Sequence, residues 1–283
     1  MATNETGGRR LLALLREHRP IVVVCMIAGL VIVFGVVGSL MVAPPDPGVR
    51  NVADLPELDS ESDREPEKER KLPDKKQAFF EFLRPVVRAE NSRIRKQRER
   101  LQELVETLEA DASISTGDRE WLARKAKRYR VKAEEPLARG RALLTRIDIV
   151  PVPLALAQAA LESAWGQSRF AREANNLFGE WCFEPGCGVV PKRRPAGKTY
   201  EVESFDGVGA SVRSYIHNLN SHPAYAELRE IRARARAEGE SPDGYEMAAG
   251  LVNYAAIGEK YVQHIRSVIE RNGLRQQPDR QSG

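Results

Sequence analysis

The sequence Leu154-Ala-Leu-Ala-Gln-Ala-Ala-Leu-Glu162-Ser-Ala-Trp-Gly166 decides how the second half of this chain folds. Its apolar residues recur at helical spacing, with Leu154, Leu161 and Trp165 on one face, so we expect a largely buried helix that stops at Gly166. Glu162 is the only carboxylate between residues 149 and 172. A carboxyl group held among Ala, Leu and Trp loses the hydration that favours its ionised form. The pattern therefore predicts a raised pKa, as in a general acid, whereas a helical glutamate seen alone is more often solvated or ion-paired.

An asparagine-rich turn, Asn175-Asn-Leu-Phe-Gly179, follows this helix. Together with Glu162-Ser-Ala-Trp-Gly-Gln-Ser168 it resembles the signature of glycoside hydrolase family 73, bacterial N-acetylglucosaminidases that cut cell-wall glycan. The arrangement is most similar to the Bax-like glucosaminidase-domain proteins of Gram-negative bacteria, and the resemblance covers residues 148 to 270. It implies a lysozyme-like fold, mainly α with a small β-hairpin lobe. It also implies hydrolysis of peptidoglycan glycan strands at N-acetylglucosaminyl linkages, with Glu162 as the general acid.

The turn itself supplies candidate substrate-binding residues. Asn175 and Asn176 tolerate turn and left-handed conformations, and their amides can bond to backbone or to a ligand. We expect them, with Phe178, to shape the floor of a cleft beside the acid. A purely turn-making role for the asparagines is the alternative.

Glycoside hydrolysis usually needs a second carboxylate, which activates water or acts as the nucleophile. In family 73 relatives this residue tends to lie in the hairpin lobe, which we place between Trp181 and Phe205. We choose Glu201, which lies in a strand-like run, although a solvated strand face is the alternative and the substrate's own acetamido group can also assist such reactions. The lobe and its end offer five candidates: Glu180, Glu184, Glu201, Glu203 and Asp206.

A third part of the site is expected near the end of the chain. The segment Asn253-Tyr254-Ala-Ala-Ile-Gly-Glu-Lys-Tyr261 resembles the family element Tyr-Ala-Thr-Asp-Pro-x-Tyr, whose first tyrosine borders the active site. Tyr254 is therefore our third catalytic candidate, and we expect Tyr261 to pack the last helix. The sequence departs from the family pattern by having Ala-Ile-Gly where the family has Thr-Asp-Pro.

Cys182 and Cys187 bracket the turn-prone sequence Phe-Glu-Pro-Gly, and an oxidising compartment would join them in a disulfide. Two cysteines provide only half of a zinc site, and neither His217 nor His222 has a recognised ligand spacing to them. We predict no metal and no cofactor. A cysteine amidase using one of these cysteines and histidines is a rival reading, but neither cysteine lies at an evident helix start beside a base.

The N-terminal region predicts a membrane anchor. Residues 21–42 form an uncharged run of 22 residues, about 33 Å long as a helix, which matches a hydrocarbon core of roughly 30 Å. Four arginines precede the run and an acidic stretch follows it, so residues 1–20 should be a cytoplasmic tail. We expect a single-pass inner-membrane protein whose catalytic domain is periplasmic. A cleaved signal peptide is the alternative.

Composition divides the rest of the chain. Residues 44 to 73 contain six prolines, nine acidic and five basic residues and no aromatic residue, so we expect a flexible stalk over residues 43–73. Residues 74–147 should form a helical accessory region, in which Pro85 kinks or splits the first helix. The glucosaminidase domain should span residues 148–274, and a tail 275–283 should follow.

The outer part of the chain is mildly basic, and Arg229-Glu-Ile-Arg-Ala-Arg-Ala-Arg236 forms a basic stripe. We expect this stripe to be a solvated helix face, because no interleaved aromatic residues or nucleic-acid motif accompany it. The predicted partners are peptidoglycan glycan and the inner membrane, and nucleic acid is excluded.

Two other functions compete with glycan hydrolysis. A lytic transglycosylase also uses one glutamate on a lysozyme-like fold, but it should carry a Gly-Leu-Met-Gln element that is missing here. A membrane-tethered, non-catalytic scaffold that only binds the wall stays open because the second acid is unsettled.

Overall fold

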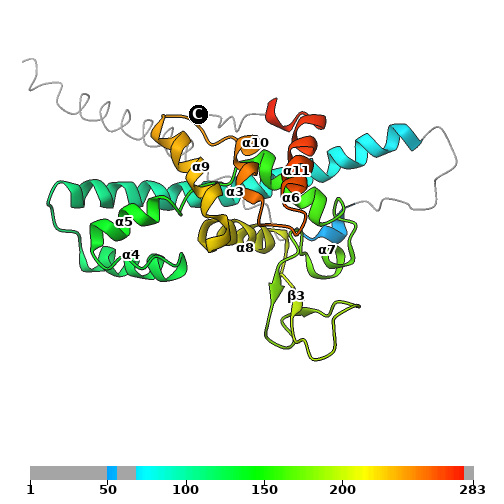
Figure 1. Cartoon of the computed structure of the whole chain (residues 1–283), viewed down its shortest axis with the longest axis horizontal. Coiled ribbons are helices and arrows are strands. Elements are labelled where there is room, and N and C mark those ends of the chain that lie inside the picture. Colours follow the sequence, from blue (N-terminus) through cyan, green and yellow to red (C-terminus); the bar gives the residue numbers. More distant parts are fainter. Residues whose placement is uncertain (1–49, 56–67, 277–283) are drawn as a thin grey trace, which may run out of the picture. The chain divides into compact units, whose positions relative to one another are not determined.

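The computed structural model describes residues 50–55 and 68–276, which all belong to one compact unit that begins at Pro47 (Figure 1). The described chain is mainly helical with one small sheet, so the predicted fold class is confirmed at that level. In chain order the helices are α3 (Lys68–Glu109), α4 (Thr116–Arg128), α5 (Pro136–Leu144), α6 (Val152–Glu162), α7 (Arg169–Ala174), α8 (Val208–Ser221), α9 (Ala226–Ala237), α10 (Gly244–Met247) and α11 (Glu259–Arg271). Short 3-10 turns are η1 (Val52–Asp54), η2 (Pro223–Tyr225), η3 (Ala248–Leu251) and η4 (Leu274–Gln276).

The long helix α3 is the support against which α5, α6 and α8 pack. It has 42 residues and continues through Pro85, so the expected split does not occur. A proline in a helix removes one backbone hydrogen bond. Here the apolar side chains on both sides of Pro85 are buried against the other helices, which compensates for that loss, and they are Phe79, Phe80, Leu83, Val86 and Val87.

Helix α6 lies at the centre of the unit, in contact with α3, α10 and α11 (Figure 1). Seven consecutive residues, Leu154 to Ala160, are buried, so nearly every face of the helix is covered by another element. Gly244 of α10 allows the closest approach, because a Cβ atom there would stand 3.0 Å from the backbone nitrogen of Leu154. The helix ends at Glu162 rather than at Gly166 as expected from the sequence.

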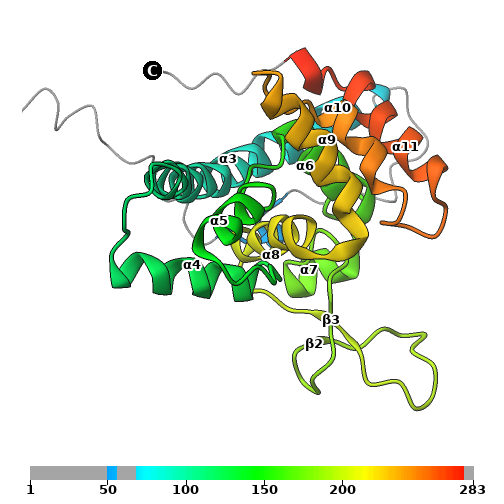
Figure 2. The same cartoon turned by 60° about the vertical axis from the view of Figure 1, so that its left-hand side comes forward.

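The small lobe is a three-stranded antiparallel sheet that extends from the helical body (Figure 2). Strand β3 (Glu201–Glu203) lies between β1 (Trp181–Cys182) and β2 (Gly188–Val189), and Trp181 pairs with Val202. Cys182 and Cys187 form a disulfide, as the sequence predicts, and it closes the loop between β1 and β2. The disulfide excludes the hypothesis of a cysteine amidase, because neither Cys182 nor Cys187 is a free thiol that could act as the nucleophile.

The basic stripe of α9 is not a solvated face, so that prediction is wrong. Arg232 is 1% exposed, and one of its terminal nitrogens donates to the carbonyls of Asp148 and Ile149 and to Asn220 Oδ1. Arg236 forms two 3.0 Å bonds to the carboxylate of Asp148. The Arg232 guanidinium therefore helps to satisfy the buried backbone between α5 and α6, together with the side chains of Asn91, Arg98 and Asn220.

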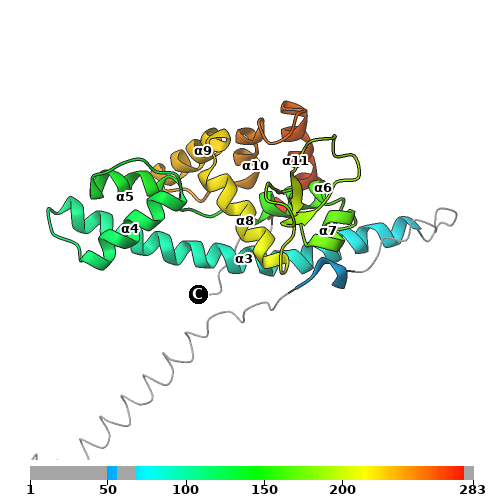
Figure 3. The same cartoon turned by 90° about the horizontal axis from the view of Figure 1, so that it is seen from below.

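Two parts of the predicted stalk have defined structure. Residues 68–73 are the first turns of α3, and residues 50–55 lie beside α7, where Figure 3 shows them in blue. Asn175 Oδ1 accepts the Val52 N–H at 2.9 Å, and Arg172 donates to the carbonyls of Val52 and Leu55. Composition alone did not reveal these partners, because they are supplied by a turn more than a hundred residues further along the chain. The remainder of the proposed stalk lies outside the described residues.

Between residues 50 and 276, omitting 56–67, no helix is both long and apolar enough to span a membrane. The predicted anchor, residues 21–42, lies outside the residues that the structure describes.

Candidate active site

Glu162 is fixed at the very end of α6 by a tight turn. The Ser163 hydroxyl donates to the Ala159 carbonyl at 2.5 Å and so occupies the last turn of the helix. Ala164 and Trp165 then adopt left-handed backbone angles, with φ of 50° and 61°. Such angles cost side-chain-bearing residues on the order of 1–3 kcal/mol each. The chain thus turns away sharply, and the Glu162 side chain is left half-buried at a helix end.

The carboxyl group of Glu162 is held by a tyrosine from α11. The Tyr261 hydroxyl donates to Glu162 Oε1 at 2.6 Å. Burial raises the pKa of Glu162, and the hydrogen bond from Tyr261 opposes that rise by favouring the ionised form. The predicted direction of the pKa shift is therefore found in the structure, and its cause is the predicted one, desolvation.

A chain of hydrogen bonds extends behind this pair. Tyr215 donates to Gln158 Oε1 at 2.7 Å, and Gln158 Nε2 donates to the Tyr261 hydroxyl at 3.1 Å. All three donors point along the chain toward Glu162, and linked bonds of this kind polarise one another. Gln158 precedes Glu162 by four residues, so both lie on one face of α6. That spacing was the sequence signal for Gln158, whereas nothing local indicated Tyr215.

The second oxygen of Glu162 faces the asparagine-rich turn. A Cβ atom on Gly179 would stand 4.0 Å from Glu162 Oε2, and Gly179 itself is exposed, with φ of 69°. Oε1 is engaged by Tyr261, so Oε2 is the oxygen left to carry a proton toward a ligand. A side chain at position 179 would both strain the turn and crowd that oxygen.

Both C-terminal tyrosines lie near Glu162. Tyr261 is buried in the core, as expected for a residue that packs the last helix, and its hydroxyl also contacts Glu162 directly. Tyr254 stacks on Tyr261 with ring centroids 5.2 Å apart and donates its hydroxyl to the Phe178 carbonyl at 3.0 Å. Burial raises the pKa of Tyr254 well above its usual value, so it stays protonated. Tyr254 thus borders the site and joins α11 to the turn.

The three predicted substrate-binding residues have structural contacts. Asn175 is left-handed at the end of α7, and its amide donates to the Phe205 carbonyl and to Asn51. Asn176 is 2% exposed and donates to two carbonyls of the lobe. Phe178, also 2% exposed, stacks on Tyr215 at 3.8 Å. These contacts support the turn-making alternative for the asparagines, and their role in substrate binding stays a prediction.

Glu201 lies in the lobe with its carboxylate turned toward the backbone. It accepts the N–H groups of Gly186 at 3.2 Å and Gly188 at 2.9 Å, and Arg194 lies 4.0 Å away. These hydrogen bonds lower the pKa of Glu201. The group thus stabilises the loop that the disulfide closes, and its predicted catalytic role is not tested by these contacts.

A carboxyl group with the opposite character is Glu180, which directly follows Gly179. Burial raises the pKa of Glu180 to about 7, against a hydrogen bond from Ser214 and with a smaller contribution from the nearby Glu203. Glu180 Oε2 is buried and has no hydrogen-bond partner among the described residues. The charges of both Glu162 and Glu180 act on the hydroxyl of Tyr225, raising its pKa further, so the two carboxyl groups share one tyrosine-rich region. The sequence analysis chose Glu201, and the position of Glu180 directly after the family turn was a signal that this choice did not use.

Within the described part of the chain, no group of three or more His, Cys, Asp or Glu side chains is placed to hold a metal ion. The hydrogen-bonded groups around Glu162 are the phenols of Tyr261 and Tyr215 and the amide of Gln158. Their chemistry is that of proton transfer and hydrogen bonding, as in carbohydrate-cleaving sites with paired carboxyl groups.

Comparison with known proteins identifies the class to which this site belongs. Residues 140–274 match the glucosaminidase family, described as mannosyl-glycoprotein endo-beta-N-acetylglucosaminidase. The chain belongs to this glucosaminidase family, which supports glycan hydrolysis related to peptidoglycan as its general activity.

More particularly, the chain is similar to Protein bax of Escherichia coli strain K12, with 32% identity over 200 residues, or 70% of each chain. The predicted Bax-like glucosaminidase resemblance is thereby confirmed. No solved structure matches the chain, so the lysozyme-like architecture stays a prediction.

Proposed function

We propose that this protein hydrolyses peptidoglycan glycan strands at N-acetylglucosaminyl linkages, with Glu162 as the general acid. The observation that carries the proposal is the Glu162 carboxyl group itself. It is half-buried at a helix end, its pKa is raised by desolvation, and one oxygen faces an exposed glycine turn. Family membership supports the same class of reaction.

Tyr261 suits the proton transfer that this role requires. When Glu162 gives its proton to the oxygen between two sugars, a carboxylate forms in a poorly hydrated place. The Tyr261 hydroxyl, 2.6 Å from Oε1, stabilises that carboxylate as it forms. Tyr261 remains a donor throughout, because burial and the neighbouring Glu162 raise its pKa far above neutral pH. It therefore acts on the transition state more than on the resting acid.

Glu180 is our candidate for the second carboxyl group of the reaction. A base that takes a proton from water works best when its pKa is near the working pH, and Glu180 has a pKa of about 7. Its unpartnered Oε2 is free to accept that proton. Glu201 is less suited, since two backbone amides already bind its carboxylate and lower its pKa.

We also propose that residues 21–42 anchor the protein in the inner membrane, with the catalytic domain in the periplasm. The support is the uncharged run itself, preceded by four arginines. A wall polymer cannot diffuse to the enzyme, so a tether would keep the site close to its substrate.

The test is a digest of purified peptidoglycan, followed by mass analysis of the new chain ends. We expect reducing N-acetylglucosamine ends from the wild type and a loss of at least about a thousand-fold in rate for Glu162→Gln, which keeps the shape but removes the acid. Glu173→Gln is the matched control, because Glu173 is an exposed glutamate on the next helix with only an ion pair to Arg169.

Three results would contradict the proposal. Anhydro-sugar ends would identify a lytic transglycosylase. Binding of the polymer without turnover by the wild type would identify a wall-binding scaffold. Unchanged turnover by Glu162→Gln would remove Glu162 from the chemistry.

A further inference from the structure

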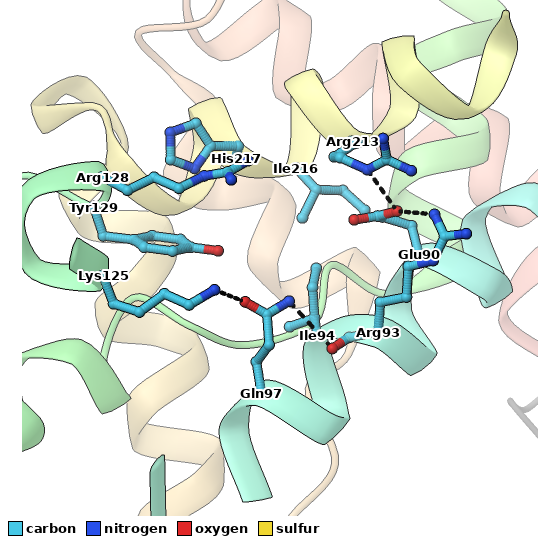
Figure 4. A pocket seen from close by; sticks show the side chains of 10 residues that line it. All are labelled: Glu90, Arg93, Ile94, Gln97, Lys125, Arg128, Tyr129, Arg213, Ile216 and His217. Atoms are coloured by element: carbon cyan, nitrogen blue, oxygen red, sulfur yellow. Dashed lines mark hydrogen bonds and ion pairs between the residues drawn. The ribbon is translucent and has the colours of Figure 1, made fainter. Parts of the chain in front are cut away.

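A cavity of about 350 Å³ lies between α3, α4 and α8, separate from the residues around Glu162 (Figure 4). Helix α8 contributes Arg213, Ile216 and His217, which recur at spacings of three and four and so share one face. Tyr215, which contacts Gln158, lies on the opposite face of the same helix. The helix therefore divides the cavity from the candidate active site.

The cavity has an excess of positive charge. Lys125 and Arg128 come from α4, Arg93 from α3 and Arg213 from α8, and the only acidic residue among the lining residues is Glu90. Glu90 binds Arg213 at 3.2 Å and Arg93 at 3.3 Å. Four cations and one carboxylate leave three positive charges in excess. An anion entering the cavity would be attracted from several sides.

Two groups on the opposite wall from Glu90 have donors to spare. Arg128 is exposed and makes no ion pair or side-chain hydrogen bond with any residue that the structure describes. His217 Nδ1 is buried and without a hydrogen-bond partner over the same residues. Burial, together with the cations Arg128, Arg130 and Lys125, lowers the pKa of His217 to about 4. The imidazole is therefore neutral at pH 7 and carries one N–H.

The remaining wall is apolar. Ile94 of α3 and Ile216 of α8 line the back of the cavity, beside the ring of Tyr129, which contacts His217 edge-on at 4.9 Å. A bare inorganic anion would fill little of 350 Å³. A ligand with both a carbon skeleton and a negative group would use both kinds of wall.

We propose that this cavity binds a small organic carboxylate of the acyl amino acid or short acidic peptide type. Its carboxylate would lie between Arg128, Lys125 and His217, and its carbon skeleton against Ile94 and Ile216. The binding of Glu90 by two arginines in the same cavity shows that its walls accept this chemistry. The proposal is independent of the glycan-hydrolase assignment, because the two sites share no residue.

The probe for the test is N-acetylglutamate, which carries two carboxylates and a short carbon chain. It is titrated into the full-length protein with isotope-labelled histidines at low salt, and the imidazole resonances are followed. The chain has four histidines, so those outside the cavity serve as internal references. We expect saturable shifts at His217 and a rise in its pKa, because a nearby anion favours the imidazolium form.

Variants locate the binding. Arg128→Gln should weaken the dissociation constant by at least about five-fold, the loss expected for one charge-assisted hydrogen bond at a partly exposed site. Lys127→Gln is the control, because Lys127 is an exposed cation on the same helix that does not line the cavity. It should change the constant by less than about two-fold.

The uncharged diamide of N-acetylglutamate and inorganic phosphate complete the design. The proposal is overturned if N-acetylglutamate gives no saturable shift or if the diamide binds as well. Phosphate binding of equal strength would show a site for charge alone and would also refute an organic carboxylate. Equal binding by Arg128→Gln and the wild type would place the probe elsewhere.

Discussion

The base of the small lobe and its outer loop each hold a glutamate that is at least half-buried, yet they shift its pKa in opposite directions. Glu180 is largely desolvated, with one carboxyl oxygen unpartnered among the described residues, and its pKa rises to about 7. Glu201 is 6% exposed, but two backbone N–H groups bind its carboxylate and its pKa falls. Desolvation thus raises the pKa of Glu180, whereas two backbone donors lower that of Glu201.

These opposite pKa shifts indicate two different uses of a glutamate, one for stability and one for chemistry. A carboxylate that is fully bonded contributes to stability, as Glu201 does for the disulfide loop. A carboxyl group that lacks donors destabilises the fold when it ionises, and such a cost persists where the group serves chemistry. Glu162 belongs with Glu180 in this respect, although Tyr261 moderates its shift.

Among the variants that test this comparison, Glu180→Gln should have the largest effect. We expect activity to fall by about a hundred-fold, as for loss of a general base. The variant should also be more stable than the wild type above neutral pH. In the wild type the folded protein binds the Glu180 proton more tightly than the unfolded chain does. This contribution to wild-type stability is fully present below pH 4.5 and is lost as the pH rises through about 7. At pH 8 the gain should be on the order of 3 kcal/mol, measured by urea unfolding.

The same unfolding measurement at pH 4 is the internal control for Glu180→Gln, since wild type and variant should then differ little. Equal stability of the two proteins at both pH values would show that Glu180 titrates normally. Full activity with raised stability would show that the raised pKa of Glu180 has no role in catalysis. Glu201 would then remain the candidate for the second carboxyl group.

A smaller and opposite effect is expected for Glu201→Gln. The neutral amide oxygen binds the N–H groups of Gly186 and Gly188 less strongly than a carboxylate does. The lobe should open more readily, with hydrogen exchange at these two amides faster by about ten-fold. Because the folded pKa is lowered, the wild-type advantage should be present above pH 4.5 and disappear as the pH falls through that lowered value.

Glu184→Gln is the matched variant, since Glu184 is an exposed glutamate in the same loop. It should leave the exchange rates unchanged. If Glu201→Gln instead abolished glycan cleavage while exchange stayed slow, the carboxylate would be catalytic, as the sequence analysis suggested.

The sequence predicted the elements that depend on local pattern. The buried helix around Glu162, the disulfide between Cys182 and Cys187 and the mainly helical class follow from spacing, loop composition and apolar content. Tyr261, by contrast, reaches Glu162 across 99 positions of the chain. Its helix α11 has an ordinary amphipathic pattern, in which a buried tyrosine reads as packing.

The sequence pattern also failed to predict the buried arginines of α9, because their partners are distant in the sequence. Four arginines in eight residues indicate a solvated face, but Arg232 and Arg236 bind Asp148 and the backbone near it, more than eighty residues earlier. The resemblance to family 73 likewise favoured the lobe for the second acid, whereas the choice between Glu180 and Glu201 depends on which backbone amides the fold presents. These features are tertiary, so no window of sequence contains them.

The smallest effect is expected for Tyr261→Phe. This variant would remove the donor to Oε1 of Glu162 and leave that oxygen without its partner, as Oε2 of Glu180 is among the described residues. Loss of the 2.6 Å bond removes the group that favours ionised Glu162, so the pKa of Glu162 should rise further. The alkaline limb of the pH profile of kcat/KM should then move upward by about one unit. The maximal rate should fall less than about ten-fold, because the carboxylate formed in the transition state is less well stabilised.

Tyr245→Phe serves as the control for this variant, since the Tyr245 ring contacts Arg266 and Arg275 rather than Glu162. Its pH profile should match the wild type. A downward shift of the alkaline limb in Tyr261→Phe would mean that Tyr261 stabilises protonated Glu162. Its hydrogen bond would then raise the pKa of Glu162, the opposite of what the backbone donors do at Glu201. An unchanged limb would mean that the ionisation of Glu162 does not set the alkaline limit of activity.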